Sequence, residues 1–318
     1  MRALVTGAAG FVGQWMCREL LERGWEVTGT VLGDIPPGVL DLDERRRVRW
    51  MRADLRRPEQ LHRALEATMP DAILHLAGVS FVPAATADPG SAFEVNTTVA
   101  VRLLGEVRMR KAAGTLDPVV LVIGTGEQYG NHDASEMPLP ESAEQRPHSV
   151  YAASKAAQEI AALEAWRTSG VRVVCTRSFN HSGPGQASSF LLPSLVERAV
   201  AARTDCHPVL ALGNTTPVRD FLHVADVVRA YALLVEKPAT GEVYNVASGR
   251  GTDVEALATR VLAAARVDAR LQIDPALVRS ADVPVLIGDP AKLEAATGWA
   301  PEYSLDSLID ELIRAASS

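Results

Sequence analysis

The chain has 318 residues, 47% of them hydrophobic, and can bury a core large enough for one sizeable domain and a smaller one, which excludes disorder of the whole chain. Its formal net charge of −7 gives no basic field for a polyanion, and the densest basic run, at 45–49, has acidic neighbours, so nucleic-acid binding is not expected. The cysteines Cys17, Cys175 and Cys206 lie far apart without Cys-x-x-Cys spacing, which argues against a disulfide framework and against a metal site.

The N-terminal residues lack the features of a signal peptide, because Arg2 leads directly into a short aliphatic run and a glycine-rich turn. The chain also has no apolar run that approaches the length needed to cross a membrane. We therefore expect a cytoplasmic protein without a membrane partner.

Short aliphatic runs alternate with segments long enough for helices over the first half of the chain. The runs predicted as strands are Arg2–Thr6, Glu26–Val31, Val48–Arg52, Ala72–Leu76, Val119–Ile123 and Val171–Thr176. This alternation is typical of βαβ crossovers, and a run such as Val119–Ile123 lacks the polar alternation of a half-exposed strand. The sequence predicts an α/β fold with a Rossmann-type, doubly wound parallel sheet that helices cover on both faces.

A glycine-rich turn at 7–13 follows the first predicted strand and precedes a helix. The backbone there has to turn tightly, approach a pyrophosphate without an intervening Cβ, and let the helix pack against the strand, and glycine meets all three demands. The pattern predicts dinucleotide binding at Gly7, Gly10 and Gly13, with Phe11 and Val12 at the start of the helix.

Later strand ends fit the same cofactor. Asp54 and Leu55 follow the third predicted strand, where the carboxylate would accept a hydrogen bond from an adenine amino group; an exposed turn carboxylate is the alternative. Leu76 and Ala77 end the fourth strand beside the expected cofactor path. The end of the second strand, at 29–34, has neither an acidic residue nor an arginine at the usual place, so NAD and NADP both stay open.

The end of the fifth predicted strand presents polar side chains where a parallel sheet meets its ligand. Thr125 offers a hydroxyl to a substrate oxygen, and Glu127 would contact a sugar hydroxyl or act as a base on a carbon next to a ketone. The alternatives are a satisfied loop threonine and an exposed loop glutamate.

Tyr151 and Lys155 stand four residues apart at the start of a predicted helix, which places the phenol and the ammonium on one face. A nearby ammonium stabilises a phenolate and is expected to lower the pKa of the tyrosine. Tyr151 would then donate a proton to a sugar oxygen as hydride arrives, or remove it in the reverse direction. An ordinary exposed Tyr/Lys pair is the alternative.

After about residue 176 the sequence becomes rich in turns, with two further predicted strands, Val218–Leu222 and Glu242–Val246, and a last helix, Leu305–Ala316. We expect residues 1–176 to form the dinucleotide-binding domain, with 218–247 returning to it. We expect 177–217 and 248–318 to form a smaller C-terminal α/β lobe that supplies a substrate site.

These motifs together resemble the extended short-chain dehydrogenase/reductase family, since the glycine turn, Asp54, Thr125 and Tyr151-x-x-x-Lys155 stand in that family's order along essentially the whole chain. The resemblance implies a Rossmann domain, NAD or NADP as cofactor, and a nucleotide-sugar-binding lobe. It also implies a homodimer built from a four-helix bundle, to which the helices Ala92–Lys111 and Tyr151–Trp166 would contribute.

Segments of the second half resemble the GDP-mannose branch of that family, namely 176–186, 218–227, 279–283, 286–292 and 298–299. A nucleoside diphosphate needs planar cations and amide donors, and Asn180, Arg219 and Arg279 suit phosphate contacts, while Asp282 would meet a ribose hydroxyl. Each of these residues is otherwise an ordinary surface group. The family more often has Arg-Pro-x-Glu at 279–282, where this chain reads Arg-Ser-Ala-Asp.

The activity that this branch implies is NAD(P)H-dependent reduction of the C4 ketone of GDP-4-keto-6-deoxy-D-mannose, which gives GDP-D-rhamnose or its C4 epimer, GDP-6-deoxy-D-talose. A GDP-mannose 4,6-dehydratase is an alternative, although related dehydratases place Asp or Ser where this chain has Gly126. A nucleotide-sugar 4-epimerase and a non-enzymatic dinucleotide-sensing regulator are further alternatives.

Overall fold

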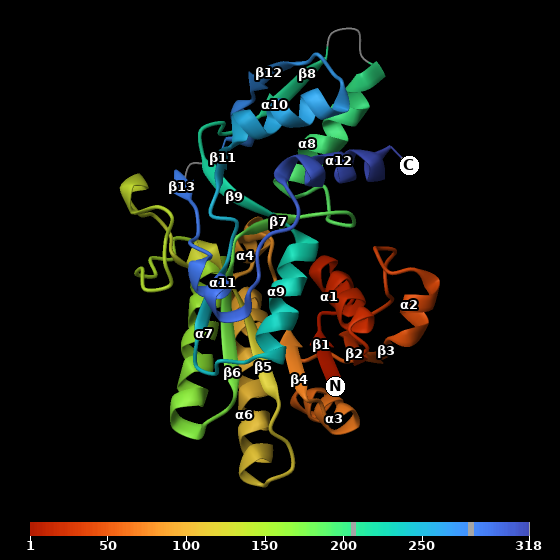
Figure 1. The fold of residues 1–318 in the computed structure, drawn as a ribbon, viewed down its shortest axis with the longest axis vertical. Coiled ribbons are helices and arrows are strands. Elements are labelled where there is room, and N and C mark those ends of the chain that lie inside the picture. The colour runs from red at the N-terminus through yellow and green to blue at the C-terminus, as the bar shows by residue number, and fades with distance from the viewer. Residues whose placement is uncertain (205–207, 279–282, 318) are drawn as a thin grey trace.

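The computed structural model describes residues 1–204, 208–278 and 283–317. Its main sheet has seven parallel strands in the order β10-β6-β5-β4-β1-β2-β3 (Figure 1). They are β1 (Arg2–Thr6), β2 (Glu26–Val31), β3 (Arg49–Arg52), β4 (Ala72–His75), β5 (Val119–Thr125), β6 (Val173–Ser178) and β10 (Val243–Val246). The predicted Rossmann-type α/β fold is confirmed, and the strand bounds agree with the prediction to within two residues.

Helices cover both faces of this sheet, which explains the absence of polar alternation in its strands. One face packs against α1 (Phe11–Glu22) and α9 (Val224–Glu236), and the other packs against α3 (Pro58–Thr68), α6 (Val99–Ala112) and α7 (Val150–Ser169). Within β1, Ala3 and Val5 belong to the first core and Leu4 belongs to the second. The shorter helices are α2 (Leu42–Arg47), α4 (Val82–Ala87), α5 (Pro89–Phe93) and α11 (Ala291–Thr297).

The helix expected over Ala92–Lys111 is interrupted. A π-helical turn, η1 (Glu94–Thr98), separates α5 from α6. At this turn the fully buried Asn96 accepts a hydrogen bond from the Val79 amide nitrogen at 2.7 Å and donates to the Val79 carbonyl oxygen at 3.1 Å. The irregular turn therefore serves to present one polar side chain to the segment that follows β4.

The remaining elements form a smaller lobe above the main sheet (Figure 1). Its apolar core lies among α8 (Leu191–Ala201), α10 (Val254–Ala265), α12 (Leu305–Ala316) and the parallel pair β8 (Val209–Leu212) and β12 (Arg270–Ile273). A second small sheet contains β7 (Asn180–Ser182), β9 (Val218–His223), β11 (Gly251–Asp253) and β13 (Val285–Leu286). The short 3-10 turns are η2 (Gly126–Gln128), η3 (Ala134–Glu136), η4 (Ala202–Thr204) and η5 (Pro275–Leu277).

One segment differs from the expected division of the chain. The strand β9 pairs with β7, β11 and β13 and not with the main sheet, whereas α9 and β10, which follow it, pack on and join that sheet. The change of sheet falls at His223, the last residue of β9 and the N-cap of α9.

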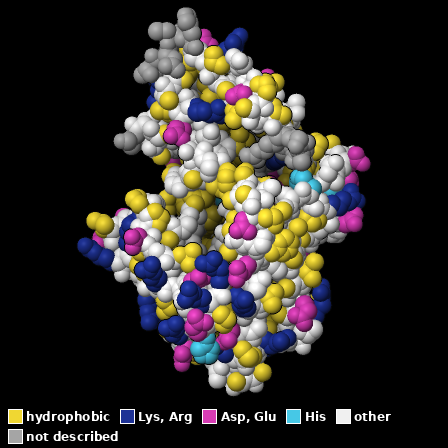
Figure 2. All heavy atoms as spheres, turned by 180° about the vertical axis from the view of Figure 1, so that it is seen from behind, with side chains coloured by type: hydrophobic (Ala, Val, Ile, Leu, Met, Phe, Trp, Pro, Cys, Tyr) yellow, Lys and Arg dark blue, Asp and Glu magenta, His cyan; other side chains and the backbone are white. Residues whose placement is uncertain are grey.

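The lobe lies over the carboxyl ends of the parallel strands (Figure 1). The chain enters it directly from one of them, since β7 begins two residues after β6 ends. Seen from behind, the molecule is hollowed between the lobe and the main body, and hydrophobic side chains gather there (Figure 2). In open α/β sheets a ligand binds outside the carboxyl ends of the strands. We therefore expect the ligand site at this edge of the sheet.

Candidate functional site

The glycine turn after β1 is shaped for close approach of another group. Gly7 has a φ of +69°, and a Cβ on Gly13 would lie 2.2 Å from the Gly7 carbonyl oxygen. The Gly10 amide donates to the same oxygen at 3.0 Å, and Gly10, the exposed N-cap of α1, leaves the helix start open. Backbone amides at a helix start suit a pyrophosphate, so these residues fit a dinucleotide. Phe11 and Val12 are half-buried beside the turn.

The end of β4 is tied to the end of β1. The Thr6 hydroxyl hydrogen-bonds to Nδ1 of His75 at 2.9 Å and accepts from the Ala77 amide at 3.1 Å. Burial, with a smaller effect from Lys155, lowers the pKa of His75 to about 3, so its ring is neutral. Leu76 and Ala77 are half-buried and continue from the glycine turn toward Lys155.

Asp54 follows β3, and its carboxylate accepts hydrogen bonds from a neighbouring arginine. Arg56 donates to both oxygens at 2.9 Å, and these hydrogen bonds are the main cause that lowers the pKa of Asp54. Leu55 beside it is buried. The adenine contact expected of Asp54 would have to use the lone pairs that Arg56 leaves.

An arginine does reach the end of β2, but it comes from the neighbouring strand. Nε of Arg52, the last residue of β3, donates to the Leu32 carbonyl oxygen at 3.1 Å, directly after β2. Residues 29–34 give no sign of this arginine, because the pairing of β2 with β3, and not chain proximity, brings it there.

Tyr151 and Lys155 lie one turn apart near the start of α7, where the Ser149 hydroxyl caps the helix by accepting from the Ala152 amide at 3.1 Å. The Lys155 side chain is buried, and its Nζ donates at 2.9 Å both to the Ile123 carbonyl oxygen of β5 and to Oε1 of Gln158. Burial lowers the pKa of Lys155 to about 8. The ammonium is therefore held against the strand that leads to Thr125.

Thr125, the last residue of β5, lies beside Tyr151, near enough for its hydroxyl to influence the pKa of the phenol. Burial raises the pKa of Tyr151 well above its ordinary value, the Glu127 carboxylate raises it further, and the Thr125 hydroxyl lowers it. This direction is opposite to the one expected from Lys155, because Lys155 donates elsewhere and the cost of burying a phenolate dominates. Tyr151 is thus a protonated phenol beside Thr125 and Glu127.

The residues expected to bind substrate lie in the small sheet of the lobe. Asn180 is in β7 opposite Phe221 of β9, and Arg219 stands two residues earlier in β9. Both Asn180 and Arg219 are half-buried. Arg279 and Asp282 lie outside the described residues.

Asn96 is a further polar residue at this site. Its amide donates to the Ser154 hydroxyl at 2.9 Å, and that hydroxyl donates to the Tyr151 carbonyl oxygen at 2.7 Å. The π turn is thereby joined to the first turn of α7. Sequence patterns gave no sign of it, because the segment around Asn96 reads as regular helix.

Among residues 1–204, 208–278 and 283–317, no group of His, Cys, Asp and Glu is placed to hold a metal ion. Within the same ranges, no helix combines the length and apolarity needed to span a bilayer.

The chain matches the GDP-mannose 4,6 dehydratase family model over residues 4–312. It is 33% identical to GDP-6-deoxy-D-mannose reductase of Pseudomonas aeruginosa, over 96% of this chain and 93% of that protein. It is 30% identical to GDP-6-deoxy-D-talose 4-dehydrogenase of Aggregatibacter actinomycetemcomitans, over 92% and 90% of the two chains.

A solved structure of RMD from Pseudomonas aeruginosa complexed with NADPH has the same fold, with a TM-score of 0.84, 30% identity and coverage of 99% of each chain. The predicted resemblance to NAD(P)-dependent nucleotide-sugar enzymes of the extended short-chain dehydrogenase/reductase type is confirmed at the level of the family. This chain belongs to the GDP-mannose 4,6 dehydratase family.

Proposed function

We propose that this protein reduces the C4 ketone of GDP-4-keto-6-deoxy-D-mannose to an alcohol, with NADPH or NADH as the hydride donor. The names of the two relatives from Pseudomonas and Aggregatibacter support this, since one is a reductase and the other a dehydrogenase of a GDP-linked 6-deoxyhexose. The observation that carries the proposal is the half-buried Tyr151, whose phenol lies beside Thr125 and keeps its proton because its pKa is raised. A ketone reductase needs a proton donor at the oxygen that receives negative charge.

The reaction adds a hydride to C4 and a proton to the oxygen, which balances the conversion of the ketone to an alcohol. The bound dinucleotide would supply the hydride. Tyr151 donates the proton, Thr125 orients the ketone oxygen, and Lys155 holds the nicotinamide ribose and supplies positive charge as Tyr151 becomes a phenolate. The glycine turn, Asp54, Leu55, Leu76 and Ala77 line the path of the dinucleotide.

The position of Arg52 supports NADPH as the preferred donor. Enzymes that use NAD place a carboxylate at the end of the second strand, and those that use NADP place an arginine near it for the 2′-phosphate. Here the Arg52 guanidinium reaches the carbonyl oxygen of the residue after β2. A phosphate on the adenosine ribose would meet this cation.

Asn180 and Arg219 would contact the diphosphate of the GDP-sugar, together with Arg279, and Asp282 would meet its ribose. The small sheet supports this assignment, because Asn180 and Arg219 lie on the paired strands β7 and β9, and β7 follows the carboxyl end of β6.

We also propose a homodimer formed through α6 and α7, which pack against each other (Figure 1). The outer faces of these helices expose large apolar side chains: Val101 is 47%, Met109 60% and Ile160 64% exposed. Apolar exposure of this kind along two adjacent helices is suited to a four-helix bundle.

The dehydratase is the second candidate, and the closeness of Glu127 to Tyr151 favours it. A 4,6-dehydratase has to remove the proton from C5, and Glu127 lies near enough to raise the pKa of Tyr151. Gly126 precedes it, and a Cβ there would lie 3.0 Å from the Phe179 ring, so a larger residue requires this ring to give by a few tenths of an ångström. The second acidic or hydroxyl group that related dehydratases have is therefore sterically disfavoured.

One assay separates these reactions. The purified protein is incubated with GDP-4-keto-6-deoxy-D-mannose, with a dTDP-linked keto sugar and with GDP-mannose, each with NADPH or NADH. We expect oxidation of the cofactor only with the GDP-linked keto sugar, and NMR of the product then gives its configuration at C4. Release of the keto sugar from GDP-mannose would replace the proposal with a dehydratase, and interconversion of sugars without net cofactor turnover would replace it with an epimerase.

A further inference from the structure

A buried polar network stands behind the loop that carries Thr125 and Glu127. Oε1 of Gln128 accepts a hydrogen bond from the Thr125 amide nitrogen at 2.8 Å, so this side chain caps the η2 turn from inside the protein. Gly124 makes room for it, because a Cβ at Gly124 would lie 2.3 Å from the same oxygen. The position of the Thr125 backbone is thus determined by Gln128.

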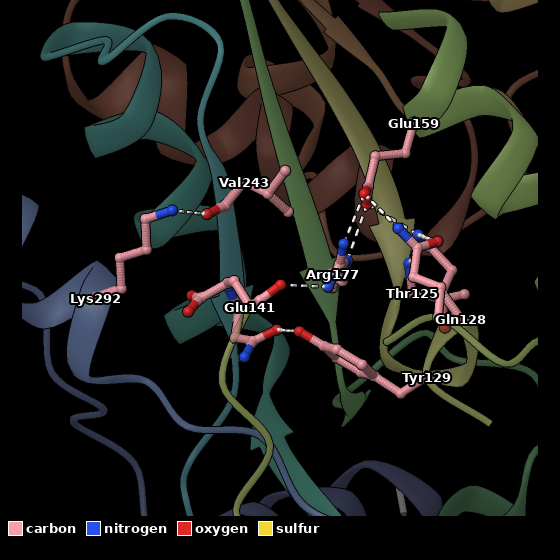
Figure 3. Close-up of polar contacts among 10 residues, drawn as sticks. Thr125, Gln128, Tyr129, Glu141, Glu159, Arg177, Val243 and Lys292 are labelled. Atoms are coloured by element: carbon pink, nitrogen blue, oxygen red, sulfur yellow. Dashed lines mark hydrogen bonds and ion pairs between the residues drawn. The ribbon is translucent and has the colours of Figure 1, made fainter. Parts of the chain in front are cut away.

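The other end of the Gln128 amide is fixed to α7. Its Nε2 donates to Oε2 of Glu159 at 2.9 Å and to Oε1 of Gln145 at 3.1 Å, and Gln145 donates to Oε1 of Glu159 at 2.6 Å (Figure 3). Glu159 lies one turn beyond Lys155 on the same helix. One carboxylate therefore connects the Thr125 loop to the helix that carries Tyr151 and Lys155.

Arg177 of β6 completes this connection. It donates to both Glu159 oxygens, from Nε at 3.0 Å and from Nη2 at 2.7 Å, and the two side chains are only 6% and 4% exposed. Figure 3 shows the Arg177 fork and the Gln128 amide meeting at Glu159. The guanidinium also lies 4.7 Å from the centre of the Tyr129 ring, in the residue after Gln128.

A buried ion pair contributes little net stability, because the loss of hydration offsets most of the attraction. Its geometric effect is large, since a planar fork on a carboxylate permits one arrangement of the two side chains. At Glu159 that arrangement fixes where the remaining lone pairs point, and these accept from Gln128 and Gln145.

We propose that Gln128 and the Glu159–Arg177 pair are positioning residues, which set the distance between the Thr125 hydroxyl and the Tyr151 phenol. This inference rests on the proposed function, in which both groups act on one ketone oxygen. Without the network, the loop that carries Thr125 and Glu127 would no longer be aligned with Tyr151. A displacement of a catalytic group by about 1 Å costs roughly 100-fold in rate.

The test uses Gln128→Met in the full chain, which removes the amide and leaves the ion pair intact. A second variant, Glu159→Met with Arg177→Met, removes both charges together, so that neither stays buried alone. The control is Asp226→Asn, because Asp226 is another fully buried carboxylate, which accepts from Arg229 at 2.6 Å and from two backbone amides, away from the Thr125 loop. Unfolding free energy, NADPH affinity, kcat, KM and hydrogen exchange of a peptide covering 124–130 are measured for each.

We expect both network variants to lower kcat by about 10- to 100-fold with little change in KM or NADPH affinity, and to increase hydrogen exchange in the 124–130 peptide. The control is expected to lose stability without either effect. The inference is overturned if Gln128→Met matches the wild type in kcat and exchange, or if Asp226→Asn loses as much kcat. Failure of the wild type to reduce the keto sugar would reject the proposed function alone, because the exchange comparison needs no substrate.

Discussion

The Lys155 ammonium donates to the Ile123 carbonyl oxygen at 2.9 Å, two residues before Thr125 on the same strand. The cation is thereby held between the helix that carries Tyr151 and the strand that carries Thr125, in surroundings that lower its pKa. The Lys155 ammonium therefore loses its proton at a lower pH than an ordinary lysine does.

We predict that kcat/KM falls as the pH rises above about 8. Lysine is a base, so the lowering of the Lys155 pKa from 10.5 to about 8 means that its ammonium is lost at a lower pH than in free lysine. The charged form is present below this pKa and absent above it, and kcat/KM reports ionisations of the free enzyme. The rate profile is to be measured from roughly pH 6 to 10.

Lys155→Arg is the matched control for that profile, because a guanidinium stays charged across the whole range. The activity of this variant will be lower, since the guanidinium cannot reproduce the two contacts of the ammonium. The decline of kcat/KM near pH 8 should nevertheless disappear. An unaltered alkaline decline in this variant would assign the ionisation to another group.

Removing the Tyr151 hydroxyl should abolish reduction while leaving the cofactor site intact. We expect Tyr151→Phe to lower kcat by about 10²- to 10⁴-fold, the contribution of a positioned general acid. Thr125→Val, which keeps the shape and removes the hydroxyl beside Tyr151, should cost on the order of 100-fold. NADPH binding, followed by fluorescence, should be the same in both variants. Unchanged turnover in Tyr151→Phe would refute the assignment of the proton donor.

Replacing Arg52 should change the choice of dinucleotide. We expect Arg52→Ala to raise the KM for NADPH by roughly 10- to 100-fold and to leave that for NADH almost unaltered, since a hydrogen bond to a charged group is worth about 1.5–3 kcal/mol. Arg49→Ala is the control, because Arg49 opens the same strand and donates to the Ala67 carbonyl oxygen instead. Equal effects on both dinucleotides would show that the 2′-phosphate does not bind at Arg52.

Gly13→Ala should impair cofactor binding and stability together. The added Cβ would lie 2.2 Å from the Gly7 carbonyl oxygen and 2.7 Å from Cα of Ala8, so the turn has to move. We expect a loss of stability of about 1–3 kcal/mol from the overpacking and a large loss of NADPH affinity. Gly90→Ala adds the same methyl group where the nearest atom is 3.7 Å away, and both quantities should be retained there. Thermal unfolding and fluorescence titration measure them.

Sequence patterns predicted the main fold closely. The buried aliphatic runs gave β1 and β2 with their observed bounds, and the last helix was placed at Leu305–Ala316, because apolar periodicity and chain turns are local properties. The parallel sheet, and the glycine turn between β1 and α1, followed from the same local signals.

Features that depend on contacts between distant segments were missed. Arg52 reaches the end of β2 only through strand pairing, and Asn96 enters the site only because a π turn rotates it inward. The spacing of Tyr151, Lys155 and Glu159 along one helix face was a usable signal for Glu159, but its partner Arg177 stands on another strand. The direction of the Tyr151 pKa was wrongly predicted because burial, which a sequence does not display, outweighs a nearby charge.

The chain returns from the lobe to the main sheet between β9 and β10, and this crossing has a consequence for protein engineering. Residues Val227 and Tyr231 of α9 share a core with Met16 of α1, so a fragment ending after β6 would expose that surface to water and be expected to aggregate. Chimaeras that graft the lobe of one relative onto the sheet of another need several matched junctions. Recombination at a single crossover near residue 177 would leave α1 facing a helix selected for a different partner.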